Sequence, residues 1–290
     1  MYYLLFGFLY LLSLLPMWLL YRVSDLAYLL VYYVIGYRKQ VVMSNLAIAF
    51  PQKTEAERAA IAKKFYRNFT DTFIETIKFI SAPRSWFDKH FSADFRKVHK
   101  IYREGRSIQF HLGHNFNWEL ANLAVPMHLP GRLSGVYLTI NSKPVDRLFR
   151  YIRGRFGTHL IPANRMREEM LRLRDKQYIL GLIADQSPSV PHKAYWTPFF
   201  GRPTGFLKQP EAGARRGDLP VFFAHFTKPR RGYYVCHAEL ATDHPAALPE
   251  GALTKMYAQY LERVMTEHPE LWLWSHRRWK YEHHPHWPLL

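Results

Sequence analysis

Short apolar runs alternate with longer helical stretches through the middle of the chain, and this alternation restricts the possible folds more than any other feature. The apolar runs read SIQFHL, RLSGVYL, HLIP and YILGLIA, and the stretches between them include VDRLFRYIRGRF and RMREEMLRLRDKQ. Strands that alternate with helices favour a mainly parallel sheet. We therefore predict an α/β fold with a mainly parallel central sheet flanked by helices.

Further helices and strands are expected before and after this region of the sequence. Residues 41–80 are predicted to be helical with a start near Thr54. An aromatic stripe on this helix should pack in the core, or alternatively form the floor of a lipid groove; it consists of Ala60, Phe65, Phe69, Phe73 and Ile77. Near the end, LPVFFAHF and GYYVCHAEL flank the turn TKPRR, which predicts a hairpin added to the sheet. Residues 252–267 should form a closing helix.

The N-terminal residues are predicted to contact a membrane. No charge occurs from Tyr2 to Leu20, which is nearly the length of about 20 residues that crosses a hydrocarbon core, although Pro16 should kink this helix. A second apolar run, LAYLLVYYVIGY, is too short to span alone and is expected to be interfacial or packed on the domain. A buried core helix is the alternative for the first run.

Charges near these runs predict the orientation of the protein. The first run has no basic segment before it and no small-residue cleavage site after it, so a cleaved signal peptide is not expected. Arg22, Arg38 and Lys39 all follow it, and the positive-inside rule then places the rest of the chain in the cytoplasm. Since the chain has no internal repeat and no linker, we expect an anchor over residues 1–40 and one domain over residues 41–290.

The segment QFHLGHNFNWEL contains the strongest candidate for chemistry. It places His114 five residues before Glu119, where an apolar strand is expected to run into a helix capped by Asn115 or Asn117. In one regular helix these side chains would point about 140° apart, so a contact between them requires a bend. With that bend, the carboxylate of Glu119 can meet the imidazole of His114 and prepare it as a general base.

Other polar residues follow predicted strands and helices. Asp185 comes directly after the strand YILGLIA, so it should face the same edge of the sheet as His114. Arg153 and Arg155 lie at a predicted helix end, where they are either ordinary partners of the helix dipole or ligands of a phosphate, an acidic carrier or a charged transition state. The helix start near Asn117 is a further candidate for oxyanion binding.

The net charge of +17 predicts an acidic partner. Nucleic acid, anionic lipid, and an acidic carrier or phosphorylated substrate all remain possible on composition. The tail segment WLWSHRRWK mixes tryptophan with cations, a combination suited to lipid headgroups, and the headgroup candidates are Arg277, Arg278 and Trp279. Stacking on nucleobases is the alternative for this tail.

Several classes of site lack support in the sequence. Cys236 is the sole cysteine, which excludes an internal disulfide and a CxxC metal site. The histidines of HHPHWP are only a weak candidate for a metal site, and no metal is expected. The chain contains no GxxxxGKS, GxGxxG, HExxH or GxSxG motif.

Taken in order, several segments resemble the late acyltransferases of lipid A biosynthesis, which belong to the lysophospholipid acyltransferase superfamily. They are the N-terminal anchor, MSNLAIAFP, HNFNWE, RGRFG, ADQSP followed by TPFFG, and PELWLWSHRRWK, and together they cover nearly the whole chain. HNFNWE matches the HX4D/E motif of that family, with His114 and Glu119 at its two functional positions. The resemblance implies a fold like that of the glycerol-phosphate acyltransferases.

The resemblance also implies a function. The family transfers a fatty acyl chain from a thioester on acyl carrier protein, or on coenzyme A, to a hydroxyl of a lipid A precursor at the bacterial inner membrane, with His114 as general base and Glu119 as its orienter. No cofactor and no nucleic-acid partner are expected. The alternatives are an aminolipid or phosphoglycolipid acceptor, hydrolysis with water as acceptor, or a non-enzymatic basic protein that binds membranes or nucleic acid.

Overall fold

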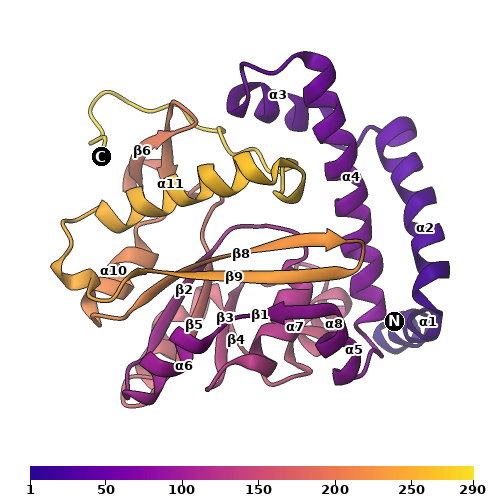
Figure 1. The fold of residues 1–290 in the computed structure, drawn as a ribbon, viewed down its shortest axis with the longest axis horizontal. Coiled ribbons are helices and arrows are strands. Elements are labelled where there is room, and N and C mark those ends of the chain that lie inside the picture. The colour runs from indigo at the N-terminus through magenta and orange to yellow at the C-terminus, as the bar shows by residue number, and fades with distance from the viewer.

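A seven-stranded sheet forms the centre of the protein, whose residues 1–290 are described by a computed structural model (Figure 1). The strand order is β1-β9-β8-β2-β5-β3-β4, and all neighbouring pairs are parallel except the antiparallel pair β8 and β9. The predicted α/β fold with a mainly parallel sheet flanked by helices is therefore confirmed. The strands of this sheet are β1 (Phe91–Ala93), β2 (Ile108–Leu112), β3 (Leu133–Tyr137), β4 (His159–Pro162), β5 (Ile179–Ile183), β8 (Val221–Arg230) and β9 (Tyr233–Thr242).

Helices cover both faces of the sheet. Among them, α11 (Ala252–Glu267) lies on one side and α7 (Trp118–His128) and α8 (Lys143–Gly154) lie on the other (Figure 1). The remaining α-helices are α1 (Tyr2–Leu14), α2 (Met17–Leu29), α3 (Lys39–Ala49), α4 (Glu55–Lys78), α5 (Arg84–His90), α6 (Arg96–Arg103), α9 (Met166–Arg172) and α10 (Gln209–Arg216). The predicted closing helix and the predicted hairpin of β8 and β9 are both present. A separate hairpin, which the sequence did not predict, joins β6 (Tyr195–Phe199) to β7 (Arg202–Phe206).

Alternate residues of β8 pack in two separate core clusters, one on each face of the sheet. Phe222 and Ala224 pack in the buried cluster that contains α7, whereas Val221 and Phe223 pack in the cluster that contains α11. Successive residues of a strand point to opposite faces, so a continuous apolar run can fill both clusters. Strand β2, at the centre of the sheet, is covered on both faces and ends beneath the loop that carries His114.

Helix α4 begins as the sequence predicts. Its N-cap is Thr54, whose side chain accepts a bond from the backbone N–H of Glu57 while the Glu57 carboxylate accepts from that of Thr54. The predicted core stripe holds only in part, because Phe65 is buried but Phe73 is 49% exposed. Residues four apart are separated by about 400°, so such a stripe turns about 40° further round the helix at each step and leaves the core.

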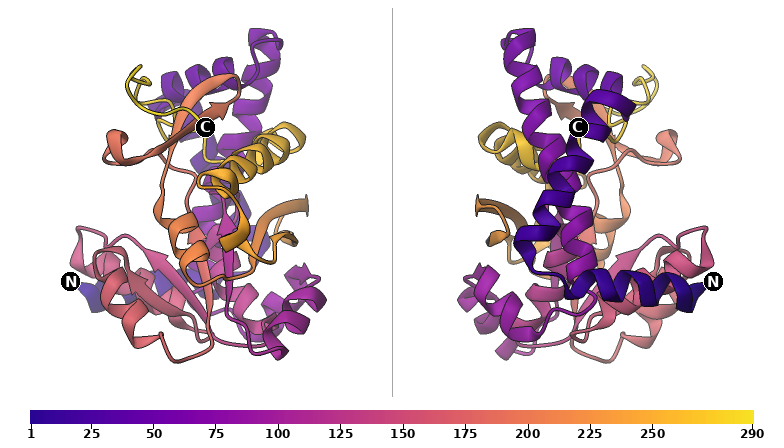
Figure 2. Two further views of the ribbon diagram at one scale, coloured as in Figure 1. Left: turned by 90° about the vertical axis from the view of Figure 1, so that its left-hand side faces the viewer. Right: turned by 90° about the vertical axis from the view of Figure 1, so that its right-hand side faces the viewer.

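The first two helices meet at Pro16, where the uncharged N-terminal run is broken rather than only kinked. Helix α2 continues into a π-helical turn, η1 (Leu30–Ile35), so that Met17–Ile35 forms one helix of 19 residues, long and apolar enough to cross a membrane. The uncharged run of residues 2–20 is therefore divided between two helices, and the second apolar run, expected to be too short to span alone, belongs to the longer one. Figure 2 shows α1 running crosswise to α2.

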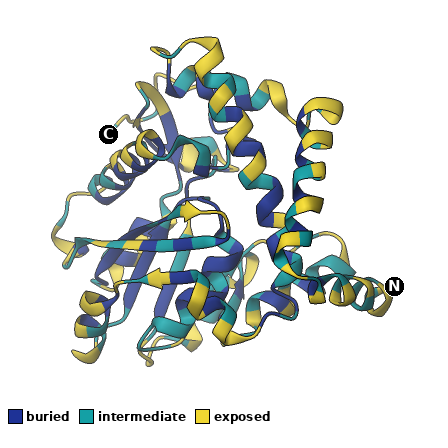
Figure 3. Cartoon of the chain, turned by 45° about the vertical axis from the view of Figure 1, so that its right-hand side comes forward, coloured by how far each residue is buried: buried dark blue, intermediate teal, exposed yellow.

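Much of the surface of these helices is exposed (Figure 3), and many of the exposed residues are apolar. Leu4, Leu11, Trp18 and Val34 each expose more than half of their surface. On its other side α2 packs along α4. The N-terminal segment is thus partly docked on the protein and partly uncovered, and the uncovered part is apolar.

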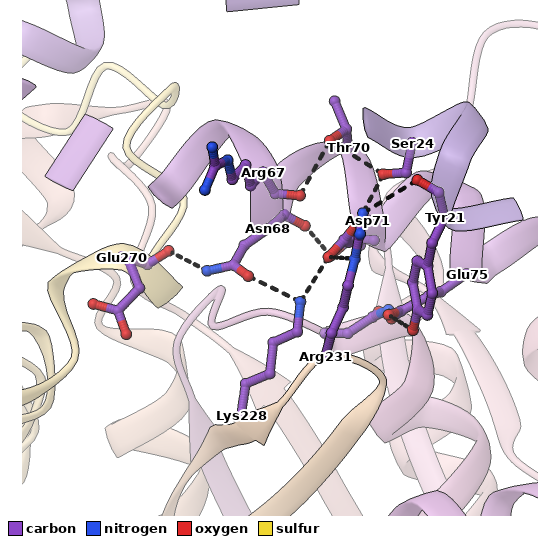
Figure 4. Close-up of polar contacts among 12 residues, drawn as sticks. Tyr21, Ser24, Arg67, Asn68, Thr70, Asp71, Glu75, Lys228, Arg231 and Glu270 are labelled. Atoms are coloured by element: carbon purple, nitrogen blue, oxygen red, sulfur yellow. Dashed lines mark hydrogen bonds and ion pairs between the residues drawn. The ribbon is translucent and has the colours of Figure 1, made fainter. Parts of the chain in front are cut away.

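A buried polar network attaches α2 to α4 and to the β8–β9 hairpin (Figure 4). Its centre is Asp71 on α4, which accepts bonds from Ser24 (2.7 Å), Lys228 (2.9 Å) and Arg231 (2.6 Å). Burial alone would raise the pKa of Asp71, but the charges of Lys228 and Arg231 together lower it. The carboxylate is therefore ionised and holds three separate elements together.

Candidate active site

The loop between β2 and α7 has the bend that the sequence predicts. Strand β2 ends at Leu112 and α7 starts at Trp118, with Asn117 as its N-cap. The side-chain oxygen of Asn117 accepts bonds from the backbone N–H groups of Glu119 (3.0 Å) and Leu120 (3.1 Å). Glu119 therefore lies in the first turn of the helix, as expected.

His114 pairs with Asp185. Its ring Nδ1 lies 2.5 Å from Asp185 Oδ1, and its backbone N–H donates to Oδ2 over 2.8 Å. The parallel register explains the contact, because Leu112 on β2 lies opposite Ile183 on β5 and each member of the pair follows its strand by two residues. Both side chains thus reach the same edge of the sheet, as predicted for Asp185.

Gly113 allows the loop to approach Asp185 this closely. A Cβ atom at this position would lie 2.9 Å from the Leu261 side chain and 3.3 Å from Asp185 Oδ2. The first distance is shorter than carbon atoms normally approach, so another residue here would require the Leu261 side chain or the loop to shift. The glycine between His114 and the end of β2 is therefore part of the site.

The environment of Asp185 determines which nitrogen of His114 carries the proton. Burial alone would raise the pKa of Asp185, but His114 and a bond from Trp272 Nε1 (2.6 Å) lower it to about 2. The ionised carboxylate can only accept, so Nδ1 of His114 must be the donor. In the neutral imidazole the lone pair is then on Nε2, which lies 3.2 Å from the side-chain nitrogen of Gln186.

Glu119 does not meet His114, contrary to the sequence-based prediction. Its carboxylate accepts both arms of the Arg153 guanidinium, through Nε at 2.9 Å and through Nη2, and it also accepts a weaker bond from Trp118 (3.2 Å). The reason is geometric, because the first turn of α7 directs Glu119 toward α8, where the planar guanidinium of Arg153 matches both carboxylate oxygens. Nδ1 of His114 is already bonded to Asp185.

The two arginines at the end of α8 have different surroundings. Arg153 is mostly buried, and although burial would lower its pKa, Glu119 raises it, so the side chain stays charged. Arg155 instead donates to the backbone oxygens of Phe79 and of Ala82 (2.9 Å), at the end of α4. Arg155 therefore has a structural role here, and its role as a substrate ligand stays a prediction.

An apolar cavity of about 360 Å³ opens beside this group. His114, Glu119, Asn122, Arg153 and Gln186 are among its polar lining residues. Most of its other lining residues are apolar, among them Phe95, Phe110, Val125, Leu133 and Phe226. Its volume lies within the range of roughly 300–1,000 Å³ that is usual for small-molecule sites. The ring of Trp118 stands edge-on to His114, with the ring centres 5.5 Å apart, and forms part of the wall.

The side chain of Asn117 is hydrogen-bonded to a buried carboxylate and does not face the cavity. Its side-chain N–H donates to Glu75 Oε2 over 2.8 Å, and the same carboxylate accepts bonds from Tyr21 (2.9 Å) and Tyr234 (2.7 Å). Asn117 and Glu75 are both completely buried. Asn117 therefore caps α7 and does not line the cavity as an oxyanion ligand.

The tryptophan-rich tail packs against the site rather than against solvent. Arg278 is 2% exposed and donates to the backbone oxygen of Gly205 (2.9 Å), and Trp279 stacks on Phe199. The prediction of Arg278 as a headgroup ligand is therefore wrong, whereas Arg277 is exposed. A sequence mixing tryptophan and arginine fits a membrane interface and a buried cation–π contact equally well, and here Arg278 lies over the ring of Phe206.

Two contacts of the site were not predicted. Trp272 donates to Asp185, and Gln186 reaches His114. Gln186 could have been predicted, because it directly follows Asp185 at the end of a strand. Nothing in the sequence marks Trp272 as a partner of Asp185, which lies 87 positions away. His111 on β2 is also buried, and burial lowers its pKa to about 3.

Residues 1–281 match the model of a family described as bacterial lipid A biosynthesis acyltransferase. A search of curated proteins found no match. The family match spans the N-terminal helices, the loop of His114, Asp185 and the tail.

Proposed function

Because this chain belongs to the bacterial lipid A biosynthesis acyltransferase family, we propose that it transfers a fatty acyl chain from a thioester to a hydroxyl of a lipid A precursor, with His114 as the general base. The observation that carries this mechanism is the His114–Asp185 pair at an apolar cavity. The donor is an acyl chain on acyl carrier protein or coenzyme A. Such a reaction needs no cofactor and no covalent enzyme intermediate.

The proposed reaction begins with proton transfer to His114. Its Nε2 takes the proton of the acceptor hydroxyl as that oxygen attacks the thioester carbonyl, and Asp185 stabilises the imidazolium that forms. The tetrahedral intermediate then collapses with breakage of the carbon–sulfur bond. The thiolate leaves and recovers the proton from His114, so the products are an ester and a free thiol.

Arg153 is the proposed partner for negative charge in this reaction. It lines the same cavity as His114, and its bidentate contact with Glu119 fixes the plane of the guanidinium. A fixed cation near a developing oxyanion favours the transition state over the neutral thioester. In this proposal Glu119 orients Arg153 and not the histidine.

The apolar cavity is the proposed site of the acyl chain. Its lining residues extend between α7 and the sheet as far as Phe95 and Cys236. Transfer of an alkyl chain into such a space is favourable by about 0.8 kcal/mol for each buried CH₂ group. Binding of the chain there would bring the thioester to His114.

Membrane attachment is proposed for residues 1–40, with residues 41–290 as the acyltransferase domain. The exposed apolar surface of α1 and α2 and the helix over Met17–Ile35 support it. Arg38 and Lys39, which follow that helix, support an orientation at the bacterial inner membrane with the domain on the cytoplasmic face. In this proposal, the acyl donor and the lipid acceptor both reach the site from that side.

An assay with purified protein in detergent tests this proposal. Wild-type protein should convert acyl carrier protein or coenzyme A thioesters and a lipid A precursor into an acylated lipid, and His114→Ala should lose the activity while keeping its unfolding transition. Free fatty acid as the only product would indicate hydrolysis instead. Full transfer activity in His114→Ala would exclude the proposed base.

A further inference from the structure

Four basic side chains gather in a second cavity that adjoins the first. Arg132, Lys143, Arg147 and Arg150, here called the α8 cation cluster, line a space of about 770 Å³ between α8 and β4. Ile140 and Leu160 line both this cavity and the apolar one that contains His114. The cluster therefore lies beside the candidate active site, separated from it by shared apolar walls.

The charge of this cluster is not neutralised within the protein. None of its four members forms an ion pair, and the single carboxylate that lines the cavity, that of Asp146, accepts a bond from the backbone N–H of Ile140 (2.9 Å). Lys143, Arg147 and Arg150 are exposed and spaced along one side of α8. A recess lined by charges of one sign concentrates ligands of the opposite sign.

Helix α1 places the cluster next to an apolar surface. The guanidinium of Arg147 lies 4.1 Å from the ring centre of Tyr2, and the rings of Phe6 and Tyr151 join α1 to α8 at 5.1 Å. On the same helix Leu4 is 80% and Phe8 62% exposed. Aromatic rings beside arginines, next to exposed aliphatic side chains, are typical of the interface between lipid headgroups and acyl chains.

From this arrangement we infer that the α8 cation cluster binds a phosphate group of the lipid acceptor while one of its acyl hydroxyls lies at His114. The inference rests on the proposed function. Guanidinium groups match phosphate oxygens through paired hydrogen bonds. A lipid acceptor would keep its acyl chains near α1, its phosphate in the cluster and its hydroxyl in the adjoining cavity. The acidic face of a carrier protein would not need a recess that adjoins the catalytic cavity.

Removal of two exposed cations tests this inference. The variant Lys143→Gln/Arg150→Gln should raise the KM for a lipid A precursor by roughly ten- to a hundredfold, as expected for lost charged hydrogen bonds. Its kcat should stay near that of the wild type, because neither residue lines the cavity of His114. The matched control is Lys97→Gln/Lys100→Gln on α6, which removes the same charge away from the cluster and should leave this KM unchanged.

A second lipid acceptor, which lacks phosphate, shows whether the cluster recognises the phosphate or another part of the lipid. With the same lipid after enzymatic removal of its phosphates, wild type and Lys143→Gln/Arg150→Gln should have equal KM values. A variant with an unchanged KM for the phosphorylated lipid would overturn the inference, as would an equal loss with both lipids. A raised KM for acyl carrier protein alone would also overturn it, in favour of carrier docking. Absence of any wild-type transfer would instead refute the proposed function.

Discussion

His114 is bound by Asp185 at two points, through its ring Nδ1 at 2.5 Å and through its backbone N–H at 2.8 Å. One carboxylate thus fixes both the rotation of the imidazole and the position of the loop that carries it. The remaining bond to Asp185, from the indole of Trp272 at 2.6 Å, comes from the tail of the chain. Segments distant in sequence therefore converge on the residue that orients the proposed base.

Replacement of Asp185 by asparagine should remove most of the activity. The amide cannot both accept from Nδ1–H and stabilise the imidazolium, so kcat should fall by roughly 10²- to 10⁴-fold. KM should change little, because Asp185 does not line the cavity. Steady-state kinetics would measure both. The matched control is Asp218→Asn, which alters the exposed pair of His244 and Asp218 and should be fully active.

Asp185 should also contribute to the loss of stability in acid. Its pKa is about 2 in the folded protein against an ordinary value of 3.8. Because the folded value is the lower one, the contribution is complete above about pH 4 and is lost as the pH falls toward 2, and it amounts to about 2 kcal/mol. Denaturant unfolding at several pH values should give a shallower acid decline for Asp185→Asn than for the wild type. Equal declines would contradict this role.

Loss of one member of the Arg153–Glu119 ion pair should destabilise the protein and reduce its activity. Their side chains are 19% and 6% exposed, so Arg153→Met leaves a buried carboxylate unpaired and should destabilise the protein by roughly 3 kcal/mol. Arg153→Lys should not restore activity, because a single ammonium cannot form the bidentate contact. Thermal unfolding and transfer assays would check both statements. Glu168→Gln, which breaks the exposed pair with Arg172, is the matched control and should change neither.

The sequence predicted the sheet but not the partner of each side chain. Alternating runs such as SIQFHL and YILGLIA specify strands and helices through local periodicity, and Asn117 specifies the start of α7 through local capping. The partner of His114 depends on the register of β2 against β5, which no local pattern contains. Glu119 is nearer in sequence than Asp185, but it points to α8 once the helices pack.

The sequence-based predictions for Pro16 and Arg278 differ from the structure for two further reasons. A proline after an apolar helix permits either a kink or a break, and the packing of α2 along α4 favours the break. For Arg278, composition indicated an interface because its buried ring partners, Phe199 and Phe206, lie far away in sequence. Tertiary packing decided both outcomes.

Glu75 should be needed for its hydrogen bonds and not for its charge. It is completely buried, and burial raises the pKa of its carboxyl group. Glu75→Met leaves the donors of Asn117, Tyr21 and Tyr234 without their acceptor, at roughly 1–3 kcal/mol for each buried group. The loop of His114 should then lose its support, so kcat should fall more than KM changes.

Glu75→Gln provides the decisive comparison. Its amide oxygen can still accept from Asn117 and Tyr234, while its NH₂ group donates to the hydroxyl of Tyr21, which can reverse its role and accept. This variant should therefore keep both stability and kcat, and Tyr21→Phe, which removes only the bond to α2, should also remain active. Kinetics and denaturant unfolding of the three variants would test the argument. If Glu75→Met kept its kcat, the bond between Glu75 and Asn117 would not be what positions the loop.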